Sequence, residues 1–145
     1  MTLRLAISGF GRIGRMVLRA LVESGRDDVA IVLINTPGPV EASAHLYEFD
    51  SIHGRARAAV SHGDGWMDVG RGRIVMTHER DPAAILHANH RVDVVLECSG
   101  HFNARDKAAL HLAAGAQRVL VSAPCKDADA TIVHGVNHAD ITADM

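Results

Sequence analysis

The first part of the chain changes from a strand-like to a helix-like hydrophobic pattern. Leu3, Leu5 and Ile7 alternate with Arg4 and Ala6, which predicts a short strand. Apolar residues then recur at helical spacing, which predicts a helix that Gly25 ends. The expected apolar stripe of this helix consists of Ile13, Met16, Val17, Ala20 and Leu21.

Further along, unbroken apolar runs alternate with helix-like segments. The runs at 29–34, 92–97 and 118–121 are typical of strands that are covered on both faces, as in a parallel sheet. Helices are expected at 40–48, at about 81–87 and from a cap at Asn103 to Gly115, with one more strand at 131–133. Repeated alternation of strand and helix predicts a doubly wound α/β fold.

Residues 55–77 have a different pattern. Glycine pairs at 63 and 65 and at 70 and 72 separate short runs at 58–60, 66–69 and 74–76. Tight turns between short strands predict a small antiparallel insertion.

Composition restricts the class of protein. The chain has 145 residues, enough for one domain over 1–145, and a net charge of −2 with acids and bases interspersed. This charge pattern excludes a nucleic-acid or membrane partner, and the apolar runs are too short to cross a bilayer. Because the first strand starts almost at Met1 and the two cysteines form no disulfide framework, we expect a cytoplasmic protein.

The turn between the first strand and the first helix carries the sequence G-x-G-x-x-G, formed by Gly9, Gly11 and Gly14. In this context the first glycine permits the tight turn, the second lets a pyrophosphate approach, and the third lets the helix pack on the strand. The helix N-terminus offers free N–H groups and a partial positive charge to the phosphates. The stretch therefore predicts dinucleotide binding.

The choice of dinucleotide stays open between NAD and NADP. A carboxylate usually follows the second strand and holds the ribose hydroxyls, but Asn35 and Thr36 stand there. Thr36 would not repel a 2′-phosphate, and only a distant arginine such as Arg80 could bind one.

Other residues at strand ends are candidate cofactor contacts. Ser99, Gly100 and Ser122 follow later strands at the same predicted edge. Arg12 lies in the glycine turn, close to the expected phosphates, whereas Arg15 and Arg19 are expected on a solvated helix face.

No catalytic or metal site is predicted. His134 and His138 have helical spacing, but the residues between them disfavour a helix and no third ligand stands nearby. Cys98 and Cys125 lack an identifiable base, so buried or inert thiols are expected.

Seven motifs together resemble the glyceraldehyde-3-phosphate dehydrogenase family, in that family's order and over essentially the whole chain. They lie at residues 5–15, 34–37, 49–54, 79–82, 97–100, 118–124 and 135–138. Erythrose-4-phosphate dehydrogenase shares most of them and remains an alternative.

The resemblance implies the Rossmann-type NAD(P)-binding domain of a phosphorylating aldehyde dehydrogenase of glycolysis, a homotetramer. By position, Arg12 and Ile13 would meet the pyrophosphate through the backbone, and Thr36 occupies the ribose position. Arg80 and Phe102 would lie by the adenine, and Ser122 near the nicotinamide.

Three departures from the family pattern stand out. Ser8 replaces the usual Asn, and Thr36 replaces the usual Asp. The sequence stops at Met145, before the family's Ser-x-Ala-Ser-Cys-Thr-Thr-Asn segment, so we expect the catalytic domain to be absent and this chain alone to be inactive. The sugar-phosphate aldehyde would bind only with that domain. The alternative from another class is a non-catalytic nucleotide-binding or interaction module.

Overall fold

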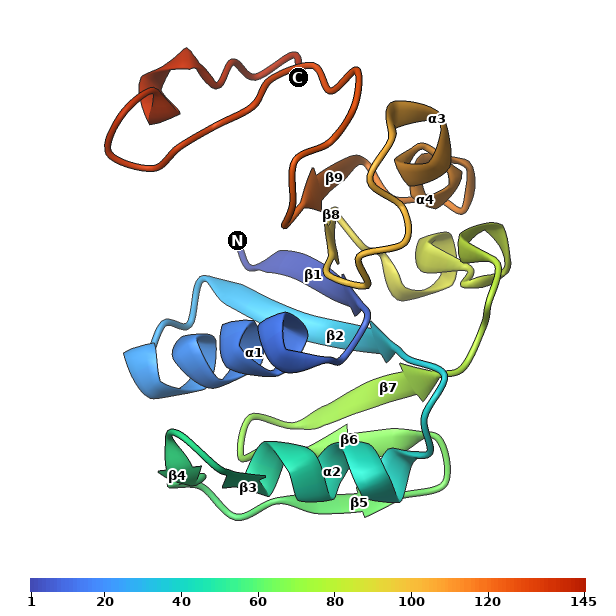
Figure 1. Ribbon diagram of the computed structural model, residues 1–145. Helices are drawn as coiled ribbons and strands as arrows, with labels where there is room; N and C mark the ends of the chain where they lie inside the picture. The colour runs from blue at the N-terminus through green and yellow to red at the C-terminus, as the bar shows by residue number, and fades with distance from the viewer.

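The computed structural model describes residues 1–145, which build one seven-stranded sheet with helices on both faces (Figure 1). The strand order is β5-β6-β7-β2-β1-β8-β9, and the five strands from β7 to β9 run parallel. The strands of this sheet are β1 (Leu3–Ser8), β2 (Val29–Asn35), β5 (Ser61–Gly63), β6 (Trp66–Asp68), β7 (Arg73–Thr77), β8 (Val94–Glu97) and β9 (Arg118–Val121). A doubly wound Rossmann-type sheet is thereby confirmed.

Two apolar clusters, one on each face of the sheet, form the core. The helices α1 (Arg12–Ser24) and α2 (Val40–Glu48) cover one face, where Leu18 and Tyr47 join the larger cluster. The other face carries the short helices η1 (Pro82–Ala84), η2 (His87–His90), α3 (Arg105–Ala108) and α4 (Leu110–Ala113). A register shift between β1 and β2 allows Ile31 and Ile34 to share a cluster while Leu33 faces the opposite one.

The antiparallel insertion is confirmed, and it extends the main sheet. β5 pairs with β6 and β6 with β7 in antiparallel order, while β7 continues the sheet parallel to β2. The run at 58–60 is not a strand, because pairing begins only at Ser61. A second antiparallel pair, β3 (Phe49–Asp50) with β4 (Gly54–Arg55), follows α2.

The buried face of α1 differs from the expected stripe. Gly14, Leu18 and Arg19 are buried, whereas Ile13 is 51% exposed. Gly14 lies against the carbonyl of Gly9, where a Cβ atom would have no room, so this side of the helix and not Ile13 faces the sheet. As predicted, Gly25 ends the helix in a left-handed conformation, with φ 68°.

Three further expectations are corrected. The segment after Asp81 forms two short 3₁₀ helices, with the Asp81 side chain accepting the N–H of Ala83. Asn103 does not cap the next helix, because Ala104 stands at the cap position and the helix has no side-chain cap; the amide nitrogen of Asn103 donates to the carbonyl of Gly100. Residues 131–133 pair with no strand.

The segment after β9 runs beyond the edge of the sheet with little regular structure, apart from the short helix η3 (His138–Asp140) (Figure 1). The guanidinium of Arg118 holds it by donating to the carbonyls of Ala143 and Met145. None of the helices combines the length and the apolar character needed to cross a bilayer.

Candidate functional site: the carboxyl edge of the parallel strands

The last residues of the five parallel strands form one row across the sheet. Register pairs Thr77 with Asn35, Asn35 with Ser8, Ser8 with Glu97, and Glu97 with Val121. The three central members are polar and buried. Strand order reverses between β1 and β8, the position at which ligands bind in such sheets.

Asn35 ties the loops of this edge together. Its amide nitrogen donates to the carbonyl of Glu79 at 2.9 Å, and its amide oxygen accepts from the Thr77 hydroxyl and the Glu79 N–H. Its own carbonyl accepts the N–H of Gly9 at 2.8 Å. Because both ends of the amide are engaged within the chain, the side chain of Asn35 acts by fixing the loops.

The glycine turn is set by close backbone contacts. Gly9 has φ +92°, and a Cβ there would lie 2.6 Å from the backbone of Ser99. A Cβ on Gly14 would lie 2.2 Å from the carbonyl oxygen of Gly9. A Cβ on Gly11, in contrast, would meet nothing within 4 Å, so the backbone at Gly11 faces open space.

The N-terminus of α1 opens onto that space. Gly11 caps the helix without a side-chain hydrogen bond, and the first helical bond joins the N–H of Arg15 to the carbonyl of Gly11. The N–H groups of Arg12 and Ile13 therefore have no acceptor within the helix. An open backbone beside free N–H groups fits a phosphate-bearing ligand.

The side chain of Arg12 turns away from this opening. It forms a two-pronged ion pair with Asp50, whose carboxylate also accepts the N–H groups of Ile52 and His53. The side chain of Asp50 is 1% exposed. The Arg12 guanidinium, followed by the backbone N–H of His53, holds the pKa of the Asp50 carboxyl well below its usual range. The pair fastens the start of α1 to the segment that follows α2.

The position after β2 carries no charge. Thr36 is buried; its N–H donates to the carbonyl of Thr77 at 3.0 Å, and its carbonyl lies 2.8 Å from Nδ1 of His78. Arg80 is exposed in the loop after β7 and forms no ion pair or hydrogen bond within the chain. This part of the edge therefore carries the neutral hydroxyl of Thr36 and the unpaired guanidinium of Arg80.

The loop after β8 completes the edge beside the glycine turn. The N–H and the hydroxyl of Ser99 both donate to one oxygen of Glu97, and Gly100 follows with φ +77°. The ring of Phe102 is half-buried. Ser122, exposed after β9, donates its N–H to the carbonyl of Glu97 at 3.0 Å. The structure therefore places the predicted cofactor-binding residues along this edge: Asn35 ends β2, Arg12, Ile13 and Gly14 lie on the first turn of α1, and the others lie on the loops that follow the parallel strands.

Sequence reasoning missed a buried polar chain beneath this edge. Nε2 of His111 lies 2.7 Å from Glu97, and Nδ1 of His111 lies 3.0 Å from Nε2 of His87. All three side chains are at most 1% exposed. The available signal was Glu97 itself, a charged residue that ends an otherwise apolar strand.

Burial and hydrogen bonding act in opposite directions on these groups. Burial alone would raise the pKa of Glu97, but the donors His111 and Ser99 together hold it below its usual value. Burial lowers the pKa of His87 to about 4, helped by His111 and His90. Burial also raises the pKa of the Cys98 thiol, which therefore stays protonated at neutral pH.

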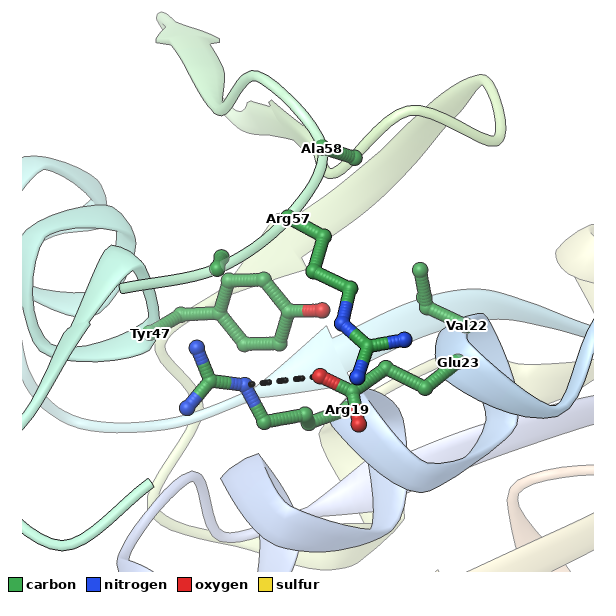
Figure 2. Close-up of a pocket in the computed structure, with 7 residues that line it drawn as sticks. Arg19, Val22, Glu23, Tyr47, Arg57 and Ala58 are labelled. Atoms are coloured by element: carbon green, nitrogen blue, oxygen red, sulfur yellow. Dashed lines mark ion pairs between the residues drawn. The ribbon is translucent and has the colours of Figure 1, made fainter. Parts of the chain in front are cut away.

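Arg19 is the clearest error of the sequence reasoning, because it is 4% exposed and not on a solvated face. It donates to the carbonyl of Gly54 at 2.9 Å, and its guanidinium lies 5.8 Å from the centre of the Tyr47 ring. Figure 2 shows it beside Glu23 and Tyr47. The three side chains line a cavity of about 340 Å³. This cavity lies between α1 and the segment after β4, away from the glycine turn.

No three His, Cys, Asp or Glu side chains come together in a way that could hold a metal ion. The rings of His134 and His138 lie 5.0 Å apart, and Nδ1 of His138 accepts the N–H of Gly135. The thiols of Cys98 and Cys125 are free and half-buried.

Comparison with known proteins shows what the chain is similar to. The sequence model described as glyceraldehyde 3-phosphate dehydrogenase, NAD binding domain, matches residues 3–105. Glyceraldehyde-3-phosphate dehydrogenase of Cereibacter sphaeroides is 60% identical over 99% of this chain and 43% of its own length. The enzymes of the same name from Xanthobacter flavus and Pseudomonas aeruginosa are 57% and 49% identical, over 42% and 43% of their lengths. The chain thus spans less than half the length of these relatives.

Proposed function

The chain belongs to the glyceraldehyde-3-phosphate dehydrogenase family, and from that premise we propose that it is the cofactor-binding part of a phosphorylating dehydrogenase. The complete enzyme would oxidise an aldehyde phosphate and transfer a hydride to NAD(P). Residues 1–145 would form one dinucleotide-binding domain. The sugar-phosphate aldehyde would bind with the part of the relatives that this chain does not span.

One observation carries the proposal: the open backbone at Gly11 beside the free N–H groups of α1. Adding a Cβ at Gly11 would fill this space, as expected where a pyrophosphate approaches the chain. The partial positive charge of the helix N-terminus favours the same ligand. Both features lie at the reversal of strand order, which is the usual ligand position.

Each residue at the edge then has a proposed role. The N–H groups of Arg12 and Ile13 bind the pyrophosphate, and Gly9 and Gly14 give the turn its shape. Asn35 fixes the loop from which Thr36 reaches the adenosine ribose. The remaining contacts are assigned to Arg80 and Phe102 at the adenine, Ser99 and Gly100 beside the glycine turn, and Ser122 towards the nicotinamide.

The bound nicotinamide ring would supply the hydride acceptor. The residues of this chain bind and orient the cofactor, and none of them is assigned a catalytic role. We therefore expect no phosphate-dependent dehydrogenase turnover from these 145 residues alone.

We propose that the site takes NADP as well as NAD. A carboxylate at the ribose position would repel a 2′-phosphate, whereas the neutral hydroxyl of Thr36 does not. Arg80, exposed and without an ionic partner, is placed on the loop that Asn35 holds beside Thr36.

We also propose that the complete protein is a cytoplasmic homotetramer. Exposed apolar side chains at and just after the end of α2 support a subunit contact, since Ile52 is 76% exposed and Phe49 is 47% exposed. The relatives extend well beyond the length of this chain, and we propose that their remaining part adds further surfaces to the assembly.

Calorimetric titration of the chain with NAD and, separately, NADP tests the proposal. We expect saturable binding of both, and at least a tenfold loss (~1.4 kcal/mol) in Gly11→Ala, because the added methyl group occupies the phosphate position. Ala20→Ser, on an exposed turn of the same helix, is the matched control and should bind as the wild type does.

A folded wild-type chain that binds neither dinucleotide would overturn the cofactor proposal. It would favour the non-catalytic interaction module instead. Equal affinity of Gly11→Ala and wild type would contradict the assigned position of the pyrophosphate.

A further inference from the structure

A line of hydrogen bonds runs from the cofactor edge into the core on the face opposite α1. Ser99 donates twice to Glu97, Glu97 pairs with His111, and His111 pairs with His87. These residues come from the end of β8, from α4 and from η2. The line ends at Nδ1 of His87, which is buried without a partner.

The hydrogen-bond inventory assigns the protons along the line. One oxygen of Glu97 already accepts twice from Ser99, and an ionised carboxylate only accepts, so Nε2 of His111 donates to the other oxygen. In neutral His111, Nδ1 then accepts from Nε2–H of His87. This arrangement leaves a lone pair on His87 unpaired, whereas the reverse order would leave a buried N–H without an acceptor.

The same contacts fix the loop that faces the glycine turn. The backbone of Ser99 lies between Gly9, which has no room for a Cβ, and Glu97, which accepts its N–H at 2.8 Å. The hydroxyl of Ser99 in turn accepts the N–H of His101 at 3.2 Å. The ring of Phe102 meets the ring of His111 edge to face, with centres 6.3 Å apart. Both sides of this loop therefore depend on Glu97 and His111.

We propose that His111, acting through Glu97, is a positioning residue that holds the Ser99–Gly100 loop and the ring of Phe102 in the form that binds the dinucleotide. The inference rests on the proposed cofactor function, and neither side chain touches the cofactor. His87 orients His111 by donating to its Nδ1. The other ionisable groups around the line are His90 beside His87 and the thiol of Cys98 beside Glu97.

Three variants separate positioning from simple packing. Glu97→Gln keeps the shape of the side chain. It replaces one carboxylate oxygen, which accepts hydrogen bonds, by an amide nitrogen that donates, although the groups facing it are themselves donors. His111→Leu keeps bulk and removes the N–H. His111→Gln restores an N–H at a similar reach from the backbone and is the rescue variant. Asp28→Asn, in the exposed ion pair with Arg26, is the surface control.

The first measurement is the affinity for NAD by calorimetry. We expect Glu97→Gln and His111→Leu to bind about tenfold more weakly than wild type, and His111→Gln to stay within about threefold. Asp28→Asn should bind as wild type does. Equal affinity in all variants, with binding by the wild type intact, would overturn the positioning role while the proposed function stands. If the wild-type chain itself does not bind NAD, the proposed function is overturned instead.

The second measurement needs no ligand. Nitrogen-15 spectra should show His87 and His111 as Nε2–H tautomers in the wild type, with the tautomers changed in Glu97→Gln. Hydrogen exchange at the amide of Ser99 should be faster in Glu97→Gln and His111→Leu than in His111→Gln. Two results would contradict the assigned line of hydrogen bonds, even if a variant lost stability. One is an Nδ1–H tautomer of His111 in the wild type, and the other is an unchanged rate of hydrogen exchange at the Ser99 amide in every variant.

Discussion

A Cβ atom on Gly9 would lie 2.6 Å from the amide nitrogen of Ser99, so the glycine turn and the loop after β8 touch backbone to backbone. The positive φ of Gly9, +92°, disfavours any other residue there as well. Two loops that are distant in sequence are thus held together at the edge where the dinucleotide is proposed to bind.

Gly9→Ala should destabilise the chain by more than about 2 kcal/mol, because the clash and the backbone strain act together. Gly14→Ala should act in the same direction, since its methyl group would meet the carbonyl of Gly9. Urea unfolding measures both. Gly11→Ala is the control and should cost less than about 1 kcal/mol. A midpoint for Gly9→Ala equal to that of the wild type would show that the two loops are not in contact.

Thr36→Asp should weaken NADP binding more than about tenfold (~1.4 kcal/mol) and change NAD binding much less, because a carboxylate repels the 2′-phosphate and accepts from ribose hydroxyls. Arg80→Ala should weaken binding of NADP only. Calorimetric titration with each dinucleotide measures both effects. Equal losses for the two cofactors would place Thr36 and Arg80 away from the 2′ position.

Asp50→Asn should lower the urea midpoint, because the amide cannot accept both prongs of Arg12 together with two backbone N–H groups. The folded-state pKa of Asp50 is depressed, so its stabilisation is present above the unfolded pKa of 3.8 and lost as the pH falls below it. The variant should therefore lose less stability on acidification than wild type does. Asp64→Asn, at an exposed carboxylate that forms no ion pair, is the control, and unchanged acid sensitivity in Asp50→Asn would rule out this contribution of Asp50.

The stability of the chain should also fall as the pH is lowered from 6.5 to about 4. The pKa of His87 is lowered from 6.5 to about 4, so the unfolded chain binds a proton in this window and the folded chain does not. The full effect is on the order of 3 kcal/mol. His87→Gln should flatten this part of the curve of unfolding free energy against pH. An equally steep curve in the variant would assign the slope to ionisable groups other than His87.

Arg19→Met should lower the free energy of unfolding by about 1 kcal/mol, because the buried guanidinium no longer donates to the carbonyl of Gly54 and Glu23 loses its ionic partner. Arg57→Met is the matched control, since Arg57 is exposed at the mouth of the same cavity (Figure 2). Chemical denaturation of both variants provides the comparison. Equal losses of unfolding free energy in the two variants would mean that the burial of Arg19 adds nothing to stability.

Local sequence patterns are sufficient to predict the alternation of strands and helices and the place of the glycine turn. Alternating or unbroken apolar runs define β1, β2, β8 and β9 through local periodicity, and Gly25 ends α1 through its own backbone freedom. These features depend on residues within a few positions of one another. The parallel strands then placed the candidate residues on one edge, since every such strand ends there.

Which side chains are buried, and what they bind, depends on how distant segments pack together. Gly14 packs on Gly9 while Ile13 is exposed, and Arg19 lies within a pocket whose other wall follows β4. The partners of Glu97, His111 and His87 come from three separate elements. Burial of a polar group is stable only where such a partner is supplied, and the partner is set by packing between distant segments, which the local sequence pattern does not contain.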